Sequence, residues 1–415
     1  MSISQVIVDF VTYAIESGGW MDLDRLYLQN RVAALVGIED LEDVTHQTPL
    51  PKVNHLVKEL VQTAHEQGLA ATDESMERVA GQLYDLLTPP PSVLNALFAQ
   101  RYDKDPVSAT DYLHFISRQN HSIIESANIH LSETSQGLLC QSITNGTEEK
   151  NIPTERHEYP HCGLCFDNEG FIGDGTTMTR MPFRYIRMNL HGESFGFRYA
   201  PYPLWHEHAL FVSEEERYQM MNLKTVNHLL QLVNIFPQYF VAAEMDQLPE
   251  EERTEHIVYQ GGRGNLPLFT RGAKATFKLE KYPTISAEIL DYPLTVCRVT
   301  SESMEELQSF VAYVIQAWRI YQADGIEAFQ KDGALNHAVD LFARKNQECY
   351  EIYIAFRQVQ SVHLRLAQVA GVAPVRHEDS ECAETLGNTL LKADPFDGNK
   401  EWIDHWMAKM NTLGE

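Results

Sequence analysis

The chain has 415 residues, of which 44% are hydrophobic, enough for two or three domains or for one large domain with a helical appendage. Its 58 acidic side chains outnumber 33 lysines and arginines and give a formal net charge of −25, which argues against binding nucleic acid or an anionic membrane through general electrostatics. No basic segment precedes a long apolar run at the N-terminus, and no stretch reaches the roughly 18 apolar residues of a spanning helix, so we expect a soluble, cytoplasmic protein.

The first part of the chain has the spacing of amphipathic helices. Apolar positions recur three and four residues apart in "VIVDFVTYAI", "VNHLVKELVQTAHEQGL" and "MERVAGQLYDLL". The breaker "TPPPS" follows, and a further helical pattern, "ATDYLHFISRQNHSII", leads into a loop rich in Asn, Gly and Glu. The sequence therefore predicts a helical N-terminal domain over residues 1–150.

The pattern changes to short β-like runs after about residue 155. They are "YIRMNL", "SFGFRYAPY", "HALFVS", "HIVYQ" and "LTVCRV", and one strong helix, "TVNHLLQLVNIF", lies among them. A second helix begins at Met304, and the strand-like "CYEIYIAFRQ" follows it. We predict an α+β domain over residues 151–415, with a largely antiparallel sheet and C-terminal helices.

Two of the six cysteines are close in sequence. Cys162 and Cys165 have the C-x-x-C spacing of zinc ligands. In the cytosol such a pair binds a metal or stays as free thiols, and the spacing leaves both readings open.

Eight stretches carry a resemblance to a known family. In chain order they are "LLTPPPSV", "ATDYLHFIS", "YPHCGLCFDNEGFIG", "NLHGESFGFRYAPY", "HEHALFVSEEE", "FPQYFVA", "YQGGRG" and "ARKNQECYEIYIAFR". Together they resemble the class II galactose-1-phosphate uridylyltransferases of the histidine-triad superfamily. The resemblance implies an α+β fold, with a helical N-terminal domain and a histidine-triad-type antiparallel half-barrel flanked by helices. It also implies double displacement between UDP-glucose and galactose 1-phosphate, through a uridylyl-histidine.

The decisive residue of that reaction is missing from this sequence. The family's run is His-x-His-x-Gln, in which the second histidine attacks phosphorus, and here it reads His256, Ile257, Val258, Tyr259, Gln260. The nucleophile position is therefore Val258, which has no lone pair. His256 is one strand repeat away, about 6.5 to 7 Å, which is too far for a reaction that needs contact at about 3 to 3.5 Å.

Other positions of the family pattern also differ. Where the family has a Gly-Gly-Ser turn beside the phosphates, this chain has Glu250, Glu251 and Glu252 in "PEEERTEH". Carboxylates there would repel a pyrophosphate. The His-rich segment expected after Arg357 is replaced by "SVHLRLAQVAGVAP". These changes favour an abandoned or repurposed site.

The resemblance implies two sets of binding residues. The metal site, for zinc or iron and with no organic cofactor, would use Cys162, Cys165, His256 and Glu216, the last at a position where the family has histidine. The expected substrate-binding residues are Arg180, Arg184, His208, Gln260, Gly261 and Gly262. The alternatives are ion-pair roles for the arginines, a structural role for His208 and an ordinary turn at Gln260.

The function has competing interpretations. In the first, a diverged uridylyltransferase homologue binds a nucleotide sugar or sugar phosphate, or acts as a partner subunit, without the family reaction. In the second, an active nucleotidyltransferase transfers UMP between UDP-glucose and a hexose 1-phosphate by an altered mechanism. A purely structural interaction protein is the third. A homodimer is left open as the assembly.

Overall fold

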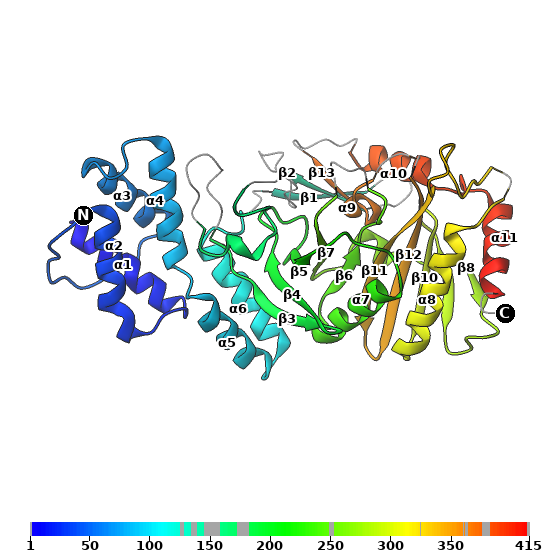
Figure 1. The fold of residues 1–415 in the computed structure, drawn as a ribbon, viewed down its shortest axis with the longest axis horizontal. Helices are drawn as coiled ribbons and strands as arrows, with labels where there is room; N and C mark the ends of the chain where they lie inside the picture. The colour runs from blue at the N-terminus through cyan, green and yellow to red at the C-terminus, as the bar shows by residue number, and fades with distance from the viewer. Residues whose placement is uncertain are drawn as a thin grey trace. The chain divides into compact units, whose positions relative to one another are not determined.

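The structure is a computed structural model. It describes residues 2–124, 128–133, 139–144, 158–171, 182–248, 253–323, 325–359, 361, 364–375 and 382–412 (Figure 1). The chain forms two compact units, one of Met1–Glu125, Glu155–Arg187 and Gly196–Pro201, the other of Ser126–Thr154, Met188–Phe195 and Tyr202–Glu415. The predicted domains, residues 1–150 and 151–415, stay a prediction, because a division into compact units does not test which parts of the chain fold independently.

The first unit contains the N-terminal helices. They are α1 (Ile3–Glu16), the short η1 (Asp22–Asp24), α2 (Arg25–Val36), α3 (Val53–Glu66), α4 (Asp73–Leu86), α5 (Pro91–Tyr102) and α6 (Pro106–Gln119). The predicted periodicity is confirmed, because Ile7, Leu56 and Leu83 of α1, α3 and α4 meet in one core and are fully buried. The helix α2 was not predicted, and its Val32 joins the same core.

A ten-stranded sheet dominates the rest of the described chain. Its order is β3-β4-β5-β7-β6-β11-β12-β10-β9-β8, and the pairs from β5 to β8 are antiparallel. The strands are β3 (Ile186–Leu190), β4 (Glu193–Tyr199), β5 (Ala209–Glu216), β6 (Phe240–Ala243), β7 (His256–Gly262), β8 (Ala273–Lys278), β9 (Ser286–Leu290), β10 (Val296–Ser301), β11 (His337–Asn346) and β12 (Cys349–Gln358). The predicted α+β fold with an antiparallel sheet is confirmed.

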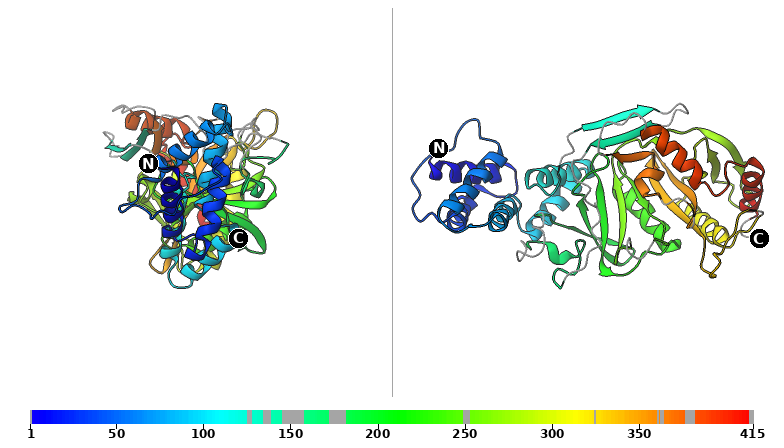
Figure 2. Two further views of the ribbon diagram at one scale, coloured as in Figure 1. Left: turned by 90° about the vertical axis from the view of Figure 1, so that its left-hand side faces the viewer. Right: turned by 90° about the horizontal axis from the view of Figure 1, so that it is seen from above.

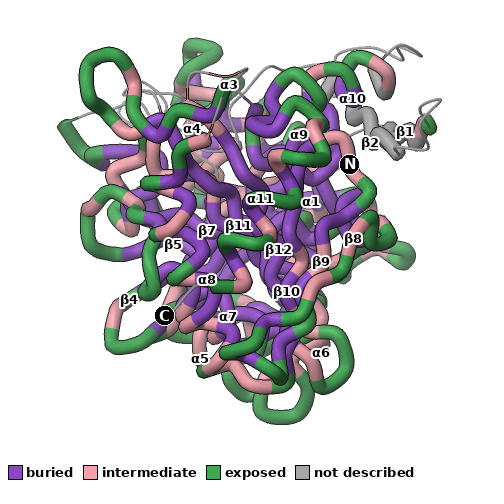
Figure 3. The backbone as a smooth tube through the Cα atoms, turned by 90° about the vertical axis from the view of Figure 1, so that its right-hand side faces the viewer, coloured by how far each residue is buried: buried purple, intermediate pink, exposed green. Residues whose placement is uncertain are grey.

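The sheet is covered on both faces. The helices α7 (Leu223–Ile235) and α8 (Met304–Arg319) pack on one face, where the ring of Trp318 lies 5.1 Å from that of Phe356. On the other face Phe269 packs against Phe342 and Tyr353, beside the short α9 (Leu366–Val369). The central strands are accordingly buried along most of their length (Figure 3).

Smaller elements complete the second unit. A three-stranded sheet has the order β1 (Asn128–Glu133), β2 (Leu139–Thr144) and β13 (Val372–Val375). The helices α10 (Cys382–Ala393) and α11 (Lys400–Asn411) follow, and α11 lies beside β8 (Figures 1 and 2). The C-terminal helices were predicted, whereas β1 and β2 were not. Within the described part of the chain, no helix is both long enough and apolar enough to cross a membrane.

Candidate functional site

Strand β7 carries the residues that the sequence singled out, and its two faces differ. Tyr259 faces α7, where its hydroxyl lies 3.0 Å from Nδ1 of His228. Because side chains alternate along a strand, His256, Val258 and Gln260 lie on the opposite face. The structure therefore gathers the predicted run on one face of the sheet, away from α7.

Val258 stands between the two polar side chains of that face. It is 8% exposed and pairs with Val212 of β5. An isopropyl group has neither a lone pair nor an exchangeable proton. At the position where the family pattern has its nucleophile, the site is therefore apolar.

Gln260 and His208 form a buried pair on the same face. Nε2 of His208 donates to Oε1 of Gln260 at 2.9 Å, because its Nδ1 accepts the backbone N–H of Leu204 at 3.2 Å. Burial lowers the pKa of His208 to about 3, although the bond to Gln260 acts in the opposite direction. The imidazole is neutral and both of its nitrogens are engaged, so His208 does not replace the missing nucleophile.

The two glycines after Gln260 lie against neighbouring groups. A Cβ added to Gly261 would lie 2.7 Å from the carbonyl oxygen of Phe240, and one added to Gly262 would lie 2.5 Å from Cδ1 of Trp205. Nε1 of Trp205 also donates to the carbonyl oxygen of Gly261 at 2.7 Å. Packing alone therefore requires both glycines, which gives the predicted substrate-binding glycines a structural role.

A buried acid, which sequence reasoning missed, fixes the turn before β5. Glu207 has φ 52° and is 3% exposed. Its carboxylate accepts a hydrogen bond from Tyr239 at 2.6 Å and pairs with Nε of Arg263 at 2.9 Å. The backbone N–H of Arg263 donates to the carbonyl oxygen of His206 at 3.0 Å. The turn is thus tied to the segment after β7. In the sequence, the one feature that could have drawn attention to Glu207 is its place between His206 and His208.

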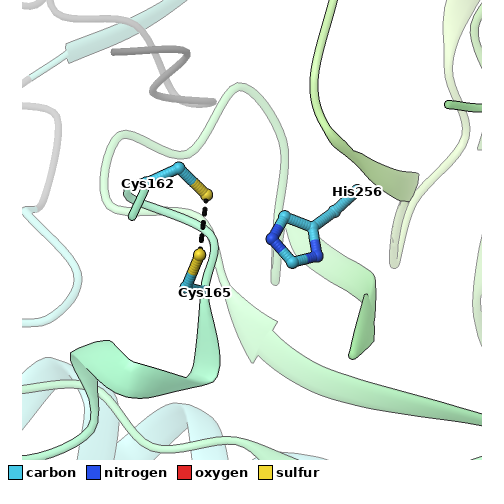
Figure 4. A group of neighbouring side chains, drawn as sticks. All are labelled: Cys162, Cys165 and His256. Carbon is cyan, nitrogen blue, oxygen red and sulfur yellow. Dashed lines mark hydrogen bonds between the residues drawn. The ribbon is translucent and has the colours of Figure 1, made fainter. Parts of the chain in front are cut away.

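Three of the four predicted metal ligands lie together. The ligand atoms of Cys162, Cys165 and His256 are all within 4.8 Å of one another, and the three residues are buried (Figure 4). Nδ1 of His256 donates to the carbonyl oxygen of Ser213 at 2.7 Å, which leaves the lone pair on Nε2. Figure 4 shows one ring nitrogen directed at the two sulfurs. Two thiols and an imidazole held in this way fit zinc or iron.

Glu216, the predicted fourth ligand, does not belong to this group. It is opposite His256 in the register of β5 and β7, after an irregularity that begins at Val212, and its side chain is exposed. The bulged strand turns the carboxylate toward solvent, so the structure does not place it with the cysteines.

The cysteine turn is held by its own hydrogen bonds. The side-chain amide of Asn168 donates to the carbonyl oxygens of Cys162 at 2.7 Å and Cys165 at 2.8 Å. The buried Arg198 donates to the carbonyl oxygen of Gly163 at 3.3 Å. The two sulfurs are 3.2 Å apart as a result of this local framework. Sequence reasoning did not assign Asn168 this role.

The predicted arginines have different outcomes. Arg184 is buried, pairs with Asp85 at 2.7 Å and donates to the carbonyl oxygen of Pro89 at 3.3 Å. It thereby fixes the end of α4, as in the ion-pair alternative, and its predicted contact with substrate stays a prediction. Arg180 lies outside the described residues, as does the run Glu250–Glu252.

Comparisons with known proteins agree with the sequence pattern. A family model described as the N-terminal domain of galactose-1-phosphate uridyl transferase matches residues 19–154. A galactose-1-phosphate uridylyltransferase of Enterococcus faecalis is 32% identical over 372 residues, which are 85% of this chain and 74% of that protein. One from Staphylococcus saprophyticus is 33% identical over 409 residues, 93% of this chain and 82% of that protein. Among solved structures, yeast Ap4A phosphorylase Apa2 covers 72% of this chain and 94% of its own, with 12% identity and a TM-score of 0.41, too low to bear on fold or function.

Proposed function

Because this chain belongs to the galactose-1-phosphate uridylyltransferase family, we propose that it binds a nucleotide sugar or a sugar phosphate without forming a uridylyl-histidine. The family acts on these ligands, and the chain keeps part of the expected polar set. It lacks the group that would attack phosphorus. The proposed role is that of a binder or of a partner subunit.

One observation carries this proposal, the valine at position 258 between two polar neighbours. Covalent transfer needs a nitrogen lone pair in line with the phosphorus. Val258 has none, and the lone pair of His208 accepts the N–H of Leu204. The lone pair of His256 is on the nitrogen suited to a metal. These engagements support binding without covalent catalysis.

Gln260 supplies the polar contact that we propose for the phosphoryl group. Its Oε1 is used by His208, and this bond sets the orientation of the amide. The amide nitrogen, with two N–H donors, then points away from His208. A donor with a fixed orientation suits a phosphoryl oxygen, which accepts hydrogen bonds strongly.

The proposed metal has a structural role. Cys162, Cys165 and His256 would hold zinc or iron, with a fourth ligand that is not Glu216 in the present arrangement. A metal there would cross-link segments that are far apart in the sequence and would stabilise the fold.

The alternative is an active nucleotidyltransferase that moves UMP between UDP-glucose and a hexose 1-phosphate by an altered mechanism. Retention of Gln260, Gly261, Gly262 and the cysteine pair favours it. The packing role of the two glycines weakens this support, because their retention has a second cause.

The test combines intact mass and binding. The protein is incubated with UDP-glucose, its mass is examined for an added uridylyl group, and exchange with galactose 1-phosphate is assayed. We expect no adduct and no exchange. We also expect calorimetric binding of UDP-glucose or galactose 1-phosphate, weakened by Gln260→Ala and unchanged by Gln62→Ala, an exposed glutamine on α3. An adduct mapped to His256, or turnover above background, would restore the enzyme interpretation. Absence of binding to all ligands would favour an interaction protein.

Val258→His provides a second test of the proposal. Restoring the imidazole alone should not restore turnover, because the family's Gly-Gly-Ser turn beside the phosphates and its His-rich segment after Arg357 are also replaced in this sequence. Residues that act together in catalysis contribute non-additively, so replacing one of several lost groups restores little activity. Substantial exchange activity in the single variant would show that the rest of the active site is intact.

A further inference from the structure

An acidic residue lies beside Val258 on the neighbouring strand. β6 pairs with β7 near the middle of the sheet, in a register that sets Ala242 opposite Gln260 (Figure 1). Continued by two residues, the same register sets Glu244 opposite Val258. On its other side Val258 pairs with Val212 of β5. The position of the family's nucleophile therefore has an apolar side chain as one neighbour and a carboxylate as the other.

Two contacts fix the place of Glu244 and the direction of its side chain. The backbone N–H of Met245 donates to Oδ1 of Asp340 on β11 at 2.8 Å, so the chain continues along β11 past the end of β6. Oε1 of Glu244 accepts the backbone N–H of Leu366 at 3.2 Å. Leu366 begins α9, which packs on the face of the sheet away from α7. The carboxylate of Glu244 is therefore on the face that carries Gln260.

Glu244 has both the exposure and the hydrogen-bonding capacity to contact a ligand. It is half-buried, whereas its neighbour Asp340 is fully buried and pairs with Arg357 at 2.7 Å. The charge of Asp340 is therefore compensated inside the protein. A carboxylate accepts about four hydrogen bonds, so the bond from Leu366 does not exhaust the capacity of Glu244.

A carboxylate in this place suits either a metal ion or the hydroxyl groups of a sugar. A metal ion held by the protein needs several side chains that converge on one point. Among the described residues, the one group of potential ligands that meets this condition is that of Cys162, Cys165 and His256, and Glu244 does not belong to it. The arrangement therefore favours hydroxyl groups, which donate strong, charge-assisted hydrogen bonds to a carboxylate.

Glu244 and Gln260 are diagonal neighbours on adjacent strands, roughly 7 to 8 Å apart at their Cα atoms, and Val258 adjoins both. We propose that Glu244 recognises the ring hydroxyl groups of a sugar phosphate whose phosphoryl group is bound by Gln260, a role that rests on the binding function proposed above. The sugar ring then lies over Val258, and the isopropyl group packs against its C–H groups. Glu244 is thus a specificity-determining residue, and the ligand is selected by its sugar hydroxyls.

Binding of two phosphate esters tests this role. Galactose 1-phosphate and cyclohexyl phosphate both join a six-membered ring to a phosphate, but only the first has ring hydroxyls. By calorimetry in EDTA, we expect the wild type to bind galactose 1-phosphate at least about 10-fold more tightly than cyclohexyl phosphate. Glu244→Gln should weaken binding of galactose 1-phosphate by about 10-fold, because it removes the charge that strengthens the hydrogen bonds. The same variant should bind cyclohexyl phosphate as tightly as the wild type or more tightly, because a negative charge near the phosphate is gone.

Opposite responses to the two esters separate recognition from a structural effect. Damage to the fold would weaken both, and the amide of Glu244→Gln keeps an acceptor for the N–H of Leu366, so the Tm should be preserved. Gln260→Ala should weaken both esters by a similar factor, because its amide contacts the phosphoryl group that they share. Glu305→Gln, exposed on α8, is the matched control and should change neither affinity.

Several outcomes would overturn the role of Glu244 and leave the proposed function standing. They are equal affinity of the wild type for the two esters, equal weakening of both by Glu244→Gln, an unchanged affinity of this variant for galactose 1-phosphate, and binding that requires added Mg²⁺. If the wild type binds neither ester, the role of Glu244 is wrong, and the proposed function fails with it if UDP-glucose does not bind either.

Discussion

Burial holds His208 in its neutral form, and this single side chain affects the pH dependence of folding. Its imidazole is bonded to Gln260 on one side and to the backbone of Leu204 on the other. Neither partner needs the ring to be charged, and a proton added to Nδ1 would meet the N–H of Leu204 head on. Protonation is therefore disfavoured as long as the turn before β5 is folded.

Acid should accordingly destabilise the protein through His208. The ordinary pKa of histidine is 6.5 and the folded pKa is about 3, so between these values the unfolded chain binds the extra proton. Stability is fully present above pH 6.5 and falls as the pH decreases, by roughly 2 kcal/mol at pH 5 from this residue. Urea unfolding at pH 7.5 and pH 5 measures the loss. His208→Gln should reduce it, whereas His55→Gln, exposed on α3, should not. An equal loss in all three proteins would contradict the assignment.

The same residues show what the sequence can predict at this scale. The identity of Val258, and its chemical consequence, can be read from one letter. The role of Arg184 cannot, because its partner Asp85 is distant in the chain and only the fold brings the two together. His208 falls between these cases. Its position in the pattern was informative, but its tautomer depends on the N–H of Leu204 and on Gln260.

At the scale of elements, the end of β7 is locked to the turn that precedes β5. Trp205 donates to Gly261, and Glu207 pairs with Arg263. These contacts hold His208 against Gln260 and leave no room for side chains at the two glycines. The backbone at this strand end is therefore part of the packing as well as part of the candidate site.

Alanine substitutions should reveal the packing role of the glycines. A Cβ at Gly262 would lie 2.5 Å from Trp205 and one at Gly261 would lie 2.7 Å from a backbone oxygen, so each change should destabilise the fold by about 1–3 kcal/mol. Gly272→Ala is the matched control, because nothing lies within 4 Å of its added Cβ. Urea unfolding without ligand gives the measurement. Stability like that of the wild type in the Gly261 and Gly262 variants would mean that these glycines serve a ligand alone.

Elements differed in how well the sequence predicted them. β7 and α7 have strong apolar patterns because each buries a face in the core. β1 and β2 were missed, because their surroundings are polar and β2 obtains its parallel partner, β13, from far along the chain. The pairing of β1 with β2 is local, whereas the long-range pairing of β2 with β13 leaves no signal in the local sequence.

At the scale of the whole molecule, compact units do not follow the linear order of the chain. The change of composition near residue 150 predicts one boundary, whereas one compact unit combines Met1–Glu125 with Glu155–Arg187 and Gly196–Pro201. A change of composition along the sequence predicts a domain boundary. It does not predict that a later segment of the chain packs into the earlier unit. The candidate metal ligands likewise combine residues that are far apart in the sequence. The C-x-x-C spacing is local, and only the fold adds His256 to it.

Metal content is the measurement that tests this ligand set. We expect up to one zinc or iron per chain in protein purified without added metal, because two buried thiols and an imidazole with its lone pair on Nε2 supply three ligands, with water as a candidate fourth. The double variant Cys162→Ser with Cys165→Ser should lose the metal, and the Tm should fall, because a metal bound only by the folded state stabilises it. Cys349→Ser, a half-buried thiol on β12, should keep both the metal and the Tm. Chelation should lower the Tm of the wild type to that of the double variant and leave the double variant unchanged. If elemental analysis finds no metal and the double variant is as stable as the wild type, the cysteines are free thiols in a site that has lost its ion, and the cross-linking role proposed for them is wrong.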